Sequence, residues 1–229
     1  MKPGLPVWRS LLYVPVNVEK YVEKAHTRGA DCILLDLEDS VPAAEKDNAR
    51  KLVSSAAARV RRGGADVAVR INRPDAMALR DLEACIGPDV NGIAATKVDD
   101  AAHLRRLDDL VAKLEAKRGL APGHTRFIAM VETPAAFFRM PEIALAVERT
   151  AAMDIGGEDF ALESGMEPTE DTLLMPKQQM VFAARAAGIM PLATSRASPH
   201  SATGRRFAAW CADRASSASW ARVASTPGR

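Results

Sequence analysis

The chain has 229 residues, 48% of them hydrophobic, and a formal net charge of +2. Charges of both signs are mixed along it, which speaks against a nucleic-acid or membrane surface, and no apolar run approaches a membrane span. The amino terminus lacks the apolar core of a signal peptide, and the three cysteines form no CxxC pair. We therefore expect a soluble cytoplasmic protein in a reducing compartment.

Short apolar runs alternate with segments of helical spacing along most of the chain. Strands are predicted at residues 10–15, 32–39, 67–72, 92–98, 127–131, 151–155 and 189–192, and helices at 18–28, 42–62, 76–85, 101–117, 135–149 and 171–187. The buried character of the strands is typical of a parallel sheet. This alternation favours a TIM (β/α)8 barrel over an open doubly wound sheet, and no GxGxxG motif follows the first strand.

The alternation stops after Leu192, where a segment rich in Ala, Ser and Arg begins that has no periodic apolar face. Such composition is typical of disorder or of a segment foreign to the fold. We predict a TIM-barrel domain over residues 1–192, lacking a proper eighth strand. The tail at 193–229 is predicted to be out of frame or disordered.

Polar side chains gather where the predicted strands end, which in a parallel barrel is the face that carries the chemistry. They are Asp36, Glu38, Asp39, Arg70, Asn72, Lys97, Glu132 and Glu158 or Asp159. This dense ring of charge predicts an active site.

Glu132 and Asp159 follow two successive buried strands, so their carboxylates are expected to converge. Two carboxylates that leave room for water and substrate oxygens suit Mg²⁺ better than Ca²⁺. The alternative for Glu132 alone is a capping or surface carboxylate. The four histidines lie in predicted helices or loops and are expected at the surface, so a zinc site is not expected.

Arg70 ends a buried strand, and its planar guanidinium suits a substrate carboxylate or a developing enolate. The alternative is a structural ion pair with Asp36, Glu38 or Asp39. Glu38 and Asp39 are expected either to hold water ligands of the metal or to cap the following helix. We predict Arg70, Glu38 and Asp39 as catalytic residues, and Arg70, Glu132 and Asn72 as substrate-binding residues.

Lys97 and the pair Lys20 and Lys24 each allow a functional and a structural interpretation. Lys97 could form a Schiff base, but Asp99 and Asp100 beside it in the sequence favour a permanently protonated ammonium. Lys20 and Lys24 fit a solvated helix face better than a phosphate-binding site.

At these residues the sequence resembles the citrate lyase beta-subunit-like CoA-ester lyases of the HpcH/HpaI aldolase superfamily. The matching stretches are RSLLYVP at 9–15, GAD with LDLEDSV at 29–41, VRIN at 69–72, MVETPA at 130–135, GGEDF at 156–160 and PKQQM with AARAAG at 176–188. The resemblance covers Arg9 to Leu192.

The resemblance implies a homotrimeric or hexameric TIM barrel with Mg²⁺ between Glu132 and Asp159. It also implies that Arg70 contacts the 2-oxo acid or the acyl carbonyl. The implied reaction is cleavage of a 3-hydroxyacyl-CoA, such as citryl-CoA or malyl-CoA, to acetyl-CoA and a 2-oxo acid. Some members of this group act instead as malate synthases or thioesterases, and a catalytically silent binding or structural subunit is the competing class.

The tail departs from the resemblance, because members of this family continue into an eighth strand and a Cys-Ile-His-Pro-like segment. Codons for residues 193–201 permit a shifted frame that reads Gly-Tyr-Ile-Ala-Gly-Ile-Ala-Ala-Phe-Arg. Those for 221–228 permit Gly-Ala-Gly-Cys-Val-His-Pro-Gly. We therefore hypothesise that the tail is read out of frame.

Overall fold

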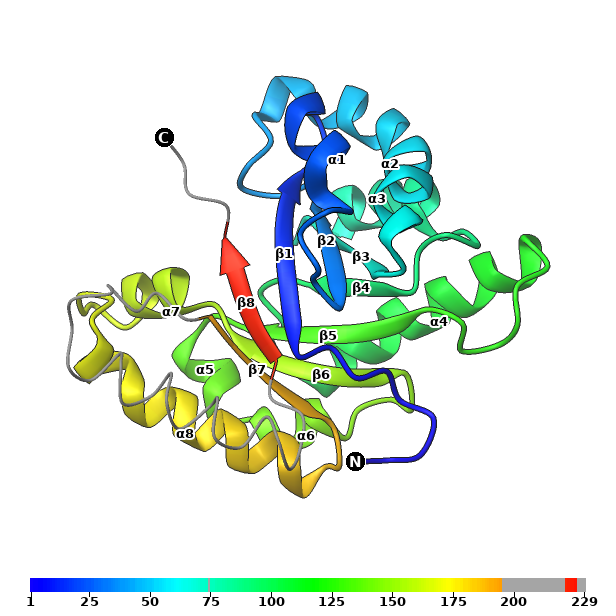
Figure 1. Ribbon diagram of the computed structural model, residues 1–229. Helices are drawn as coiled ribbons and strands as arrows, with labels where there is room; N and C mark the ends of the chain where they lie inside the picture. The colour runs from blue at the N-terminus through cyan, green and yellow to red at the C-terminus, as the bar shows by residue number, and fades with distance from the viewer. Residues whose placement is uncertain (74, 195–220, 226–229) are drawn as a thin grey trace.

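The computed structural model describes residues 1–73, 75–194 and 221–225. Within them, eight parallel strands form one closed barrel in sequence order, with the helices around its outside (Figure 1). The strands are β1 (Ser10–Pro15), β2 (Cys32–Asp36), β3 (Asp66–Ile71), β4 (Gly92–Ala95), β5 (Arg126–Val131), β6 (Thr150–Ile155), β7 (Met190–Thr194) and β8 (Ala221–Ser225).

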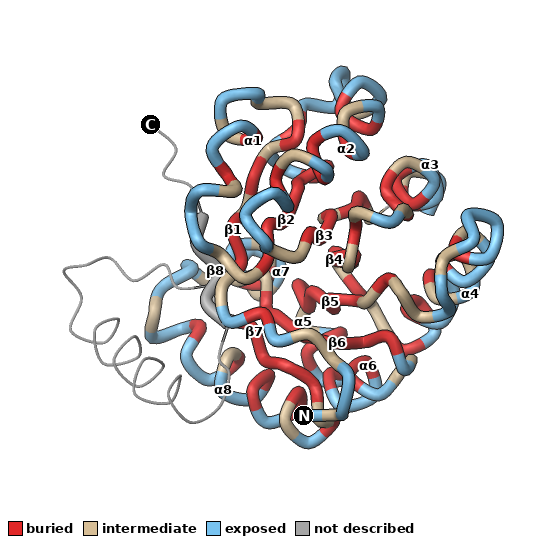
Figure 2. The backbone as a smooth tube through the Cα atoms, turned by 45° about the vertical axis from the view of Figure 1, so that its right-hand side comes forward, coloured by how far each residue is buried: buried red, intermediate tan, exposed pale blue. Residues whose placement is uncertain are grey.

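The helices follow the strands and cover the outer face of the barrel. They are α1 (Glu19–Ala25), α2 (Lys46–Val60), α3 (Asp75–Cys85), α4 (Ala101–Lys117), α5 (Pro134–Phe137), α6 (Met140–Ala144), α7 (Gly157–Glu163) and α8 (Glu170–Ala186). Two 3₁₀ turns, Ala43–Glu45 and Arg61–Gly63, flank α2. Where burial is described, the strands from β1 to β7 are mostly buried, and the helices are exposed where they face away from the barrel (Figure 2).

The core has two layers, because successive side chains of a strand point to opposite faces. The outward-facing side chains pack under the helices, and the inward-facing ones fill the barrel. Trp8 closes the amino-terminal end of the interior and donates a hydrogen bond from Nε1 to Asp66, 2.7 Å away. Gly92 permits this packing, since a Cβ there would lie 2.9 Å from the indole ring.

The prediction of a TIM barrel is confirmed, and most elements lie where the apolar pattern placed them. The predicted helix at 135–149 is two short helices, since Pro141 lies at the start of α6. The sequence analysis missed α7, which begins directly after β6 and therefore belongs to the carboxyl end of the barrel. The predicted strand at 92–98 ends early, at Ala95.

The sequence analysis predicts no proper eighth strand, and in the structure a short strand closes the barrel at this position. A five-residue strand, β8, pairs with β1 and β7 and closes the barrel. Neither its sequence, ARVAS, nor its surroundings show a buried apolar run, so the pattern gave no signal for it. The rest of the predicted tail, 195–220 and 226–229, lies outside the described residues.

A helix that crosses a bilayer must be both long and apolar. None in the described part of the chain meets both requirements for crossing a membrane.

Candidate active site

The polar ring predicted from the sequence lies at the carboxyl ends of β2 to β5 and in the first turn of α7. Asp36 ends β2, and Arg70 is its direct neighbour in register on β3. Glu132 follows β5 by one residue, and Asp159 lies in the first turn of α7. The structure therefore brings most of the predicted residues to one end of the barrel.

Arg70 forms a two-point ion pair with Asp36. Its Nε lies 2.8 Å from Oδ1 and its Nη2 lies 2.6 Å from Oδ2. Asp36 also accepts hydrogen bonds from Ser40 and from the backbone N–H of Glu38. Burial alone would raise the pKa of Asp36, but the hydrogen bonds and charge of Arg70 outweigh it and hold the pKa below its ordinary value. The structural alternative considered for Arg70 is therefore present in the structure.

The remaining nitrogen of the Arg70 guanidinium reaches the next two carboxylates. Its Nη1 lies 2.8 Å from Glu38 and 3.3 Å from Asp39, and the guanidinium stands over the ring of Tyr13. The side chain is only 12% exposed. The pair with Asp36 therefore fixes the guanidinium, and Nη1 is the nitrogen that faces the acidic residues following β2.

Lys97 links the two sides of the polar ring. Its Nζ lies 2.9 Å from Asp159 and 3.3 Å from Glu38, and its backbone N–H donates to Glu132 Oε2 at 2.6 Å. Burial would lower the pKa of the ammonium, but Asp159 and Glu38 raise it above its ordinary value. This environment disfavours the neutral amine that a Schiff base requires.

The partners of Lys97 differ from those that the sequence suggested. Asp99 pairs with Arg73, and Asp100 caps α4 by accepting a hydrogen bond from the backbone of His103. The carboxylates that hold the ammonium come instead from β2 and α7, far away in the sequence.

Glu132 is a buried carboxyl group with few donors. It is 3% exposed, and its pKa is raised to about 8, chiefly by burial and further by the charges of Glu38 and Asp159. The Lys97 backbone N–H acts in the opposite direction and lowers the pKa. Gly156 makes room for this side chain, since a Cβ there would lie 2.3 Å from Glu132 Oε1.

Asn72 lies in a buried network beside the polar ring. Its Nδ2 donates to Leu37 O at 3.0 Å and to Asp81 at 2.7 Å, and its backbone N–H also donates to Asp81. Arg50 closes the network with a 2.6 Å contact to Asp81. Both amide hydrogens thus stabilise the loop after β3, and substrate binding by Asn72 stays a prediction.

Two side chains that the sequence analysis did not single out belong to the same end of the barrel. Tyr13 lies on the same face of β1 as buried Leu11, and burial together with Asp154 raises the pKa of its hydroxyl. Asp154 pairs in register with Met130 of the interior layer and is itself buried. A carboxylate within an otherwise apolar strand was the signal that could have identified Asp154.

The residues that could hold a metal are Glu132 and Asp159. Within the described ranges, no three His, Cys, Asp or Glu side chains form a ready ligand cage. However, Mg²⁺ commonly takes one or two carboxylates and keeps several waters. Asp159 and Glu38 already face a cation, the Lys97 ammonium, and Glu132 lacks a compensating charge of its own. The donor set therefore fits a hard divalent cation.

Among the described residues, no histidine contacts the polar ring through a hydrogen bond or ion pair. The expectation that His103 lies at the surface is wrong, because this residue of α4 is buried. His200 lies outside the described residues.

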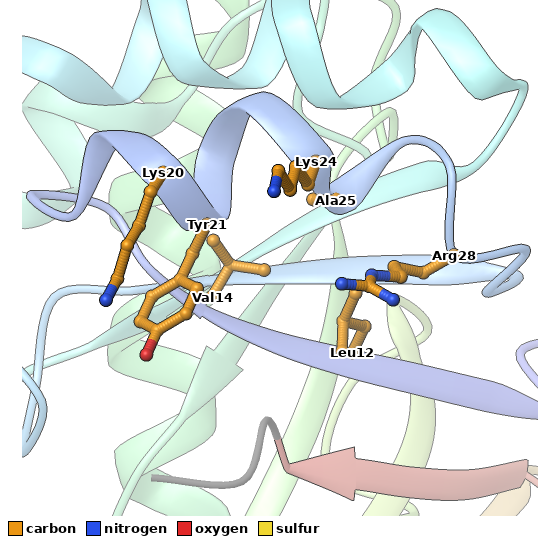
Figure 3. Close-up of a pocket in the computed structure, with 7 residues that line it drawn as sticks. All are labelled: Leu12, Val14, Lys20, Tyr21, Lys24, Ala25 and Arg28. Carbon is orange, nitrogen blue, oxygen red and sulfur yellow. The ribbon is translucent and has the colours of Figure 1, made fainter. Parts of the chain in front are cut away.

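A separate pocket lies outside the barrel, between α1 and β1 (Figure 3). Leu12, Val14 and Ala25 form part of its apolar wall. Lys20, Lys24 and Arg28 line it at four-residue intervals. The lysine pair, expected to be a solvated helix face, thus contributes to a basic pocket.

Fold and site together define a (β/α)8-barrel protein with an acidic, cation-holding site at the carboxyl ends of its strands. Residues 9–219 match the HpcH/HpaI aldolase/citrate lyase family. The chain belongs to this family.

Two curated relatives and one solved structure illustrate the relationship. The citrate lyase subunit beta of Leuconostoc mesenteroides subsp. cremoris is 34% identical over 184 residues, covering 79% of this chain and 61% of the relative. A (3S)-malyl-CoA thioesterase of Cereibacter sphaeroides is 35% identical over 185 residues, with 80% and 61% covered. The citrate lyase beta subunit of M. tuberculosis, complexed with oxaloacetate and magnesium, has a TM-score of 0.70 and 26% identity, with 96% and 92% covered. The match thus spans about three-fifths of the length of the curated relatives.

Proposed function

We propose that this chain is a Mg²⁺-dependent CoA-ester lyase. It cleaves a 3-hydroxyacyl-CoA of the citryl-CoA or malyl-CoA type to acetyl-CoA and a 2-oxo acid. The single observation that carries the proposal is the group of carboxylates Glu38, Glu132 and Asp159, all of which contact Lys97 beside Arg70.

Glu132 and Asp159 would hold the metal. When bound, Mg²⁺ supplies a Lewis acid for the oxygens of the 2-oxo acid. The related M. tuberculosis structure is a complex with oxaloacetate and magnesium, which supports a role for Mg²⁺ in binding a 2-oxo acid.

Arg70 acts as a hydrogen-bond donor to the substrate, and Glu38 acts as the general base. The Arg70 Nη1 donates to the acid or to the acyl carbonyl, and its pair with Asp36 keeps the guanidinium in place. Glu38 accepts the proton of the 3-hydroxyl group, which its burial-raised pKa favours. The carbon–carbon bond then breaks, its electron pair passes to the thioester as an enolate, and a proton completes acetyl-CoA. Asp39 is exposed and supports Arg70 through its 3.3 Å contact.

The basic pocket between α1 and β1 is proposed to take the phosphates of CoA. Lys20 lies near the start of α1, just after the carboxyl end of β1, which places this part of the pocket at the same end of the barrel as Arg70. Three cations suit a ligand that carries several phosphate charges.

Association into a homotrimer or hexamer is part of the proposal, as is a cytoplasmic location. Large apolar side chains are exposed on α7, α8 and the segment after α5, namely Phe138, Leu162, Met175 and Phe182. Exposed apolar groups of this kind are typical of contact surfaces between subunits.

We also propose that the chain from residue 193 is read out of frame. The segment 221–228, which in the shifted frame gives the Cys-Val-His-Pro sequence, includes β8. Sequencing the DNA tests this directly, and a shifted frame without the family's segments would refute it. A chain altered here could instead be a silent binding or structural subunit.

The test of function is a product assay with malyl-CoA and citryl-CoA, with Mg²⁺ or with EDTA. A lyase releases acetyl-CoA and a 2-oxo acid only with Mg²⁺, and Glu132→Gln abolishes the release. Release of free CoA and the hydroxy acid would identify a thioesterase, the activity named for the Cereibacter sphaeroides relative. No turnover by a folded, Mg²⁺-binding chain would favour the silent subunit.

A further inference from the structure

Lys97 has an unusual backbone conformation for a lysine. Its φ of +48° makes it the single non-glycine residue with positive φ in the described part of the chain. L-residues other than Asn and Asp seldom adopt this conformation, and such outliers concentrate at functional sites. Here the conformation directs both the backbone N–H and the ammonium of Lys97 at an acidic cluster, which consists of Glu38, Glu132 and Asp159. The backbone N–H reaches Glu132, and the ammonium reaches Glu38 and Asp159.

The charges of the cluster explain why a cation is needed there. Glu38 and Glu132 are buried, and Asp159 is 32% exposed. The Arg70 guanidinium contacts Glu38 but is shared with Asp36 and Asp39. Among the described residues, Lys97 supplies the cation that forms an ion pair with Asp159. A flexible four-carbon stem carries this charge, and its side chain is 37% exposed, so it can move to solvent without unpacking the barrel.

We propose that Lys97 is a tethered cation that neutralises the carboxylates in the metal-free protein and leaves Asp159 when a divalent cation binds. This inference rests on the proposed function, since it takes Asp159 as a metal ligand. An ammonium and a divalent ion compete for the same carboxylate oxygen, here Asp159 Oδ2, because the two positive charges repel each other at close range. Lys97 therefore lowers the apparent affinity for metal and stabilises the chain until metal arrives.

Calorimetric titration of Mg²⁺ into the full chain tests the proposal. The variants are Lys97→Met, which removes the charge from a side chain of similar length, and Lys97→Arg, which keeps it. Lys113→Met is the matched control, because Lys113 is an exposed lysine on α4. If the ammonium occupies the site nine-tenths of the time, its removal lowers the Kd for Mg²⁺ about tenfold.

The expected result is tighter Mg²⁺ binding by Lys97→Met, wild-type affinity in Lys97→Arg and Lys113→Met, and a lower metal-free melting midpoint for Lys97→Met alone. Unchanged or weaker Mg²⁺ binding by Lys97→Met overturns the proposal for Lys97. If Glu132→Gln loses Mg²⁺ binding in the same experiment, the proposed metal site is retained although the role of Lys97 is not. If neither wild type nor Lys97→Met binds Mg²⁺, the metal site and this inference both fail. Should Lys97→Met not fold, Lys97→Gln provides the same comparison with an uncharged N–H donor.

Discussion

Two buried glutamates at opposite ends of the barrel experience opposite environments. Glu115, at the end of α4, is 1% exposed, and Glu132, after β5, is 3% exposed. The pKa of Glu115 is lowered, because two backbone N–H groups and Arg149 together outweigh burial. The pKa of Glu132 is raised to about 8, because burial dominates and its neighbours are acidic. Both glutamates are buried, yet they have opposite preferences for charge.

The difference lies in the donors that each end of the barrel supplies. Each Glu115 oxygen accepts two hydrogen bonds. One comes from a backbone N–H, of Thr125 or Gly123, and the other comes from the guanidinium of Arg149. Glu132 Oε2 accepts a hydrogen bond from the Lys97 backbone N–H. A fully paired carboxylate stabilises the fold, whereas an under-compensated one is ready to bind a cation. This fits the general division of a TIM barrel into a stabilising amino end and a catalytic carboxyl end.

The largest expected effect is on the stabilising end. Glu115→Gln leaves the buried Arg149 with Asp108 as its remaining carboxylate and should lower the free energy of unfolding by an amount in the lower part of the range of about 3–5 kcal/mol. Glu132→Gln in EDTA should cost far less or raise stability at neutral pH. Chemical denaturation of both variants measures the comparison, and equal losses would contradict the contrast between the two ends.

The pH dependence of stability should separate the same two residues. The raised pKa of Glu132 means that the folded protein favours the neutral carboxyl group. The stability that this preference contributes is fully present below the ordinary pKa of about 4.5 and is lost as pH rises toward about 8. In EDTA, Glu132→Gln should therefore gain on wild type from pH 5 to 8, by on the order of a few kcal/mol. The lowered pKa of Glu115 gives the opposite sign, with its contribution lost as pH falls below the ordinary value. A constant difference between wild type and Glu132→Gln over pH 5 to 8 would argue against a buried, uncompensated carboxyl group.

A smaller effect is expected at Arg70. Arg70→Lys keeps the positive charge but loses the two-point pair with Asp36 and the separate Nη1. Affinity for glyoxylate or oxaloacetate with Mg²⁺ present should fall about tenfold, the loss of roughly one charge-assisted hydrogen bond. Titration of the 2-oxo acid measures it, with Mg²⁺ affinity as the control. Equal affinity for the acid in wild type and variant would remove Arg70 from the binding role.

Much of the fold and the location of the site followed from the sequence. The spacing of apolar residues indicates strands and helices, and carboxylates directly after buried strands mark the active end, as at Glu132. The partners of a side chain could not be predicted in the same way. Asp99 lies beside Lys97 in the sequence, yet Glu38 and Asp159 hold its ammonium, because barrel closure brings strand ends together irrespective of sequence distance.

Short elements with weak patterns were also missed. The five residues of β8 lack the apolar run that marks the other strands, and pairing with β1 and β7 places them in the sheet. The position of Asn72 after β3 likewise does not reveal that its side-chain amide donates to Leu37 O and Asp81.

The measurement that tests the central claim most directly is thermal unfolding of the wild-type chain with Mg²⁺, with glyoxylate or oxaloacetate, and with both. A ligand that binds only the folded state raises the melting midpoint, by about 2.7 kcal/mol of stabilisation at a hundredfold excess over its Kd. We predict a cooperative transition whose midpoint rises most when Mg²⁺ and the 2-oxo acid are present together. A cooperative transition that neither additive moves would contradict a metal-dependent oxo-acid site at the carboxyl end of this barrel.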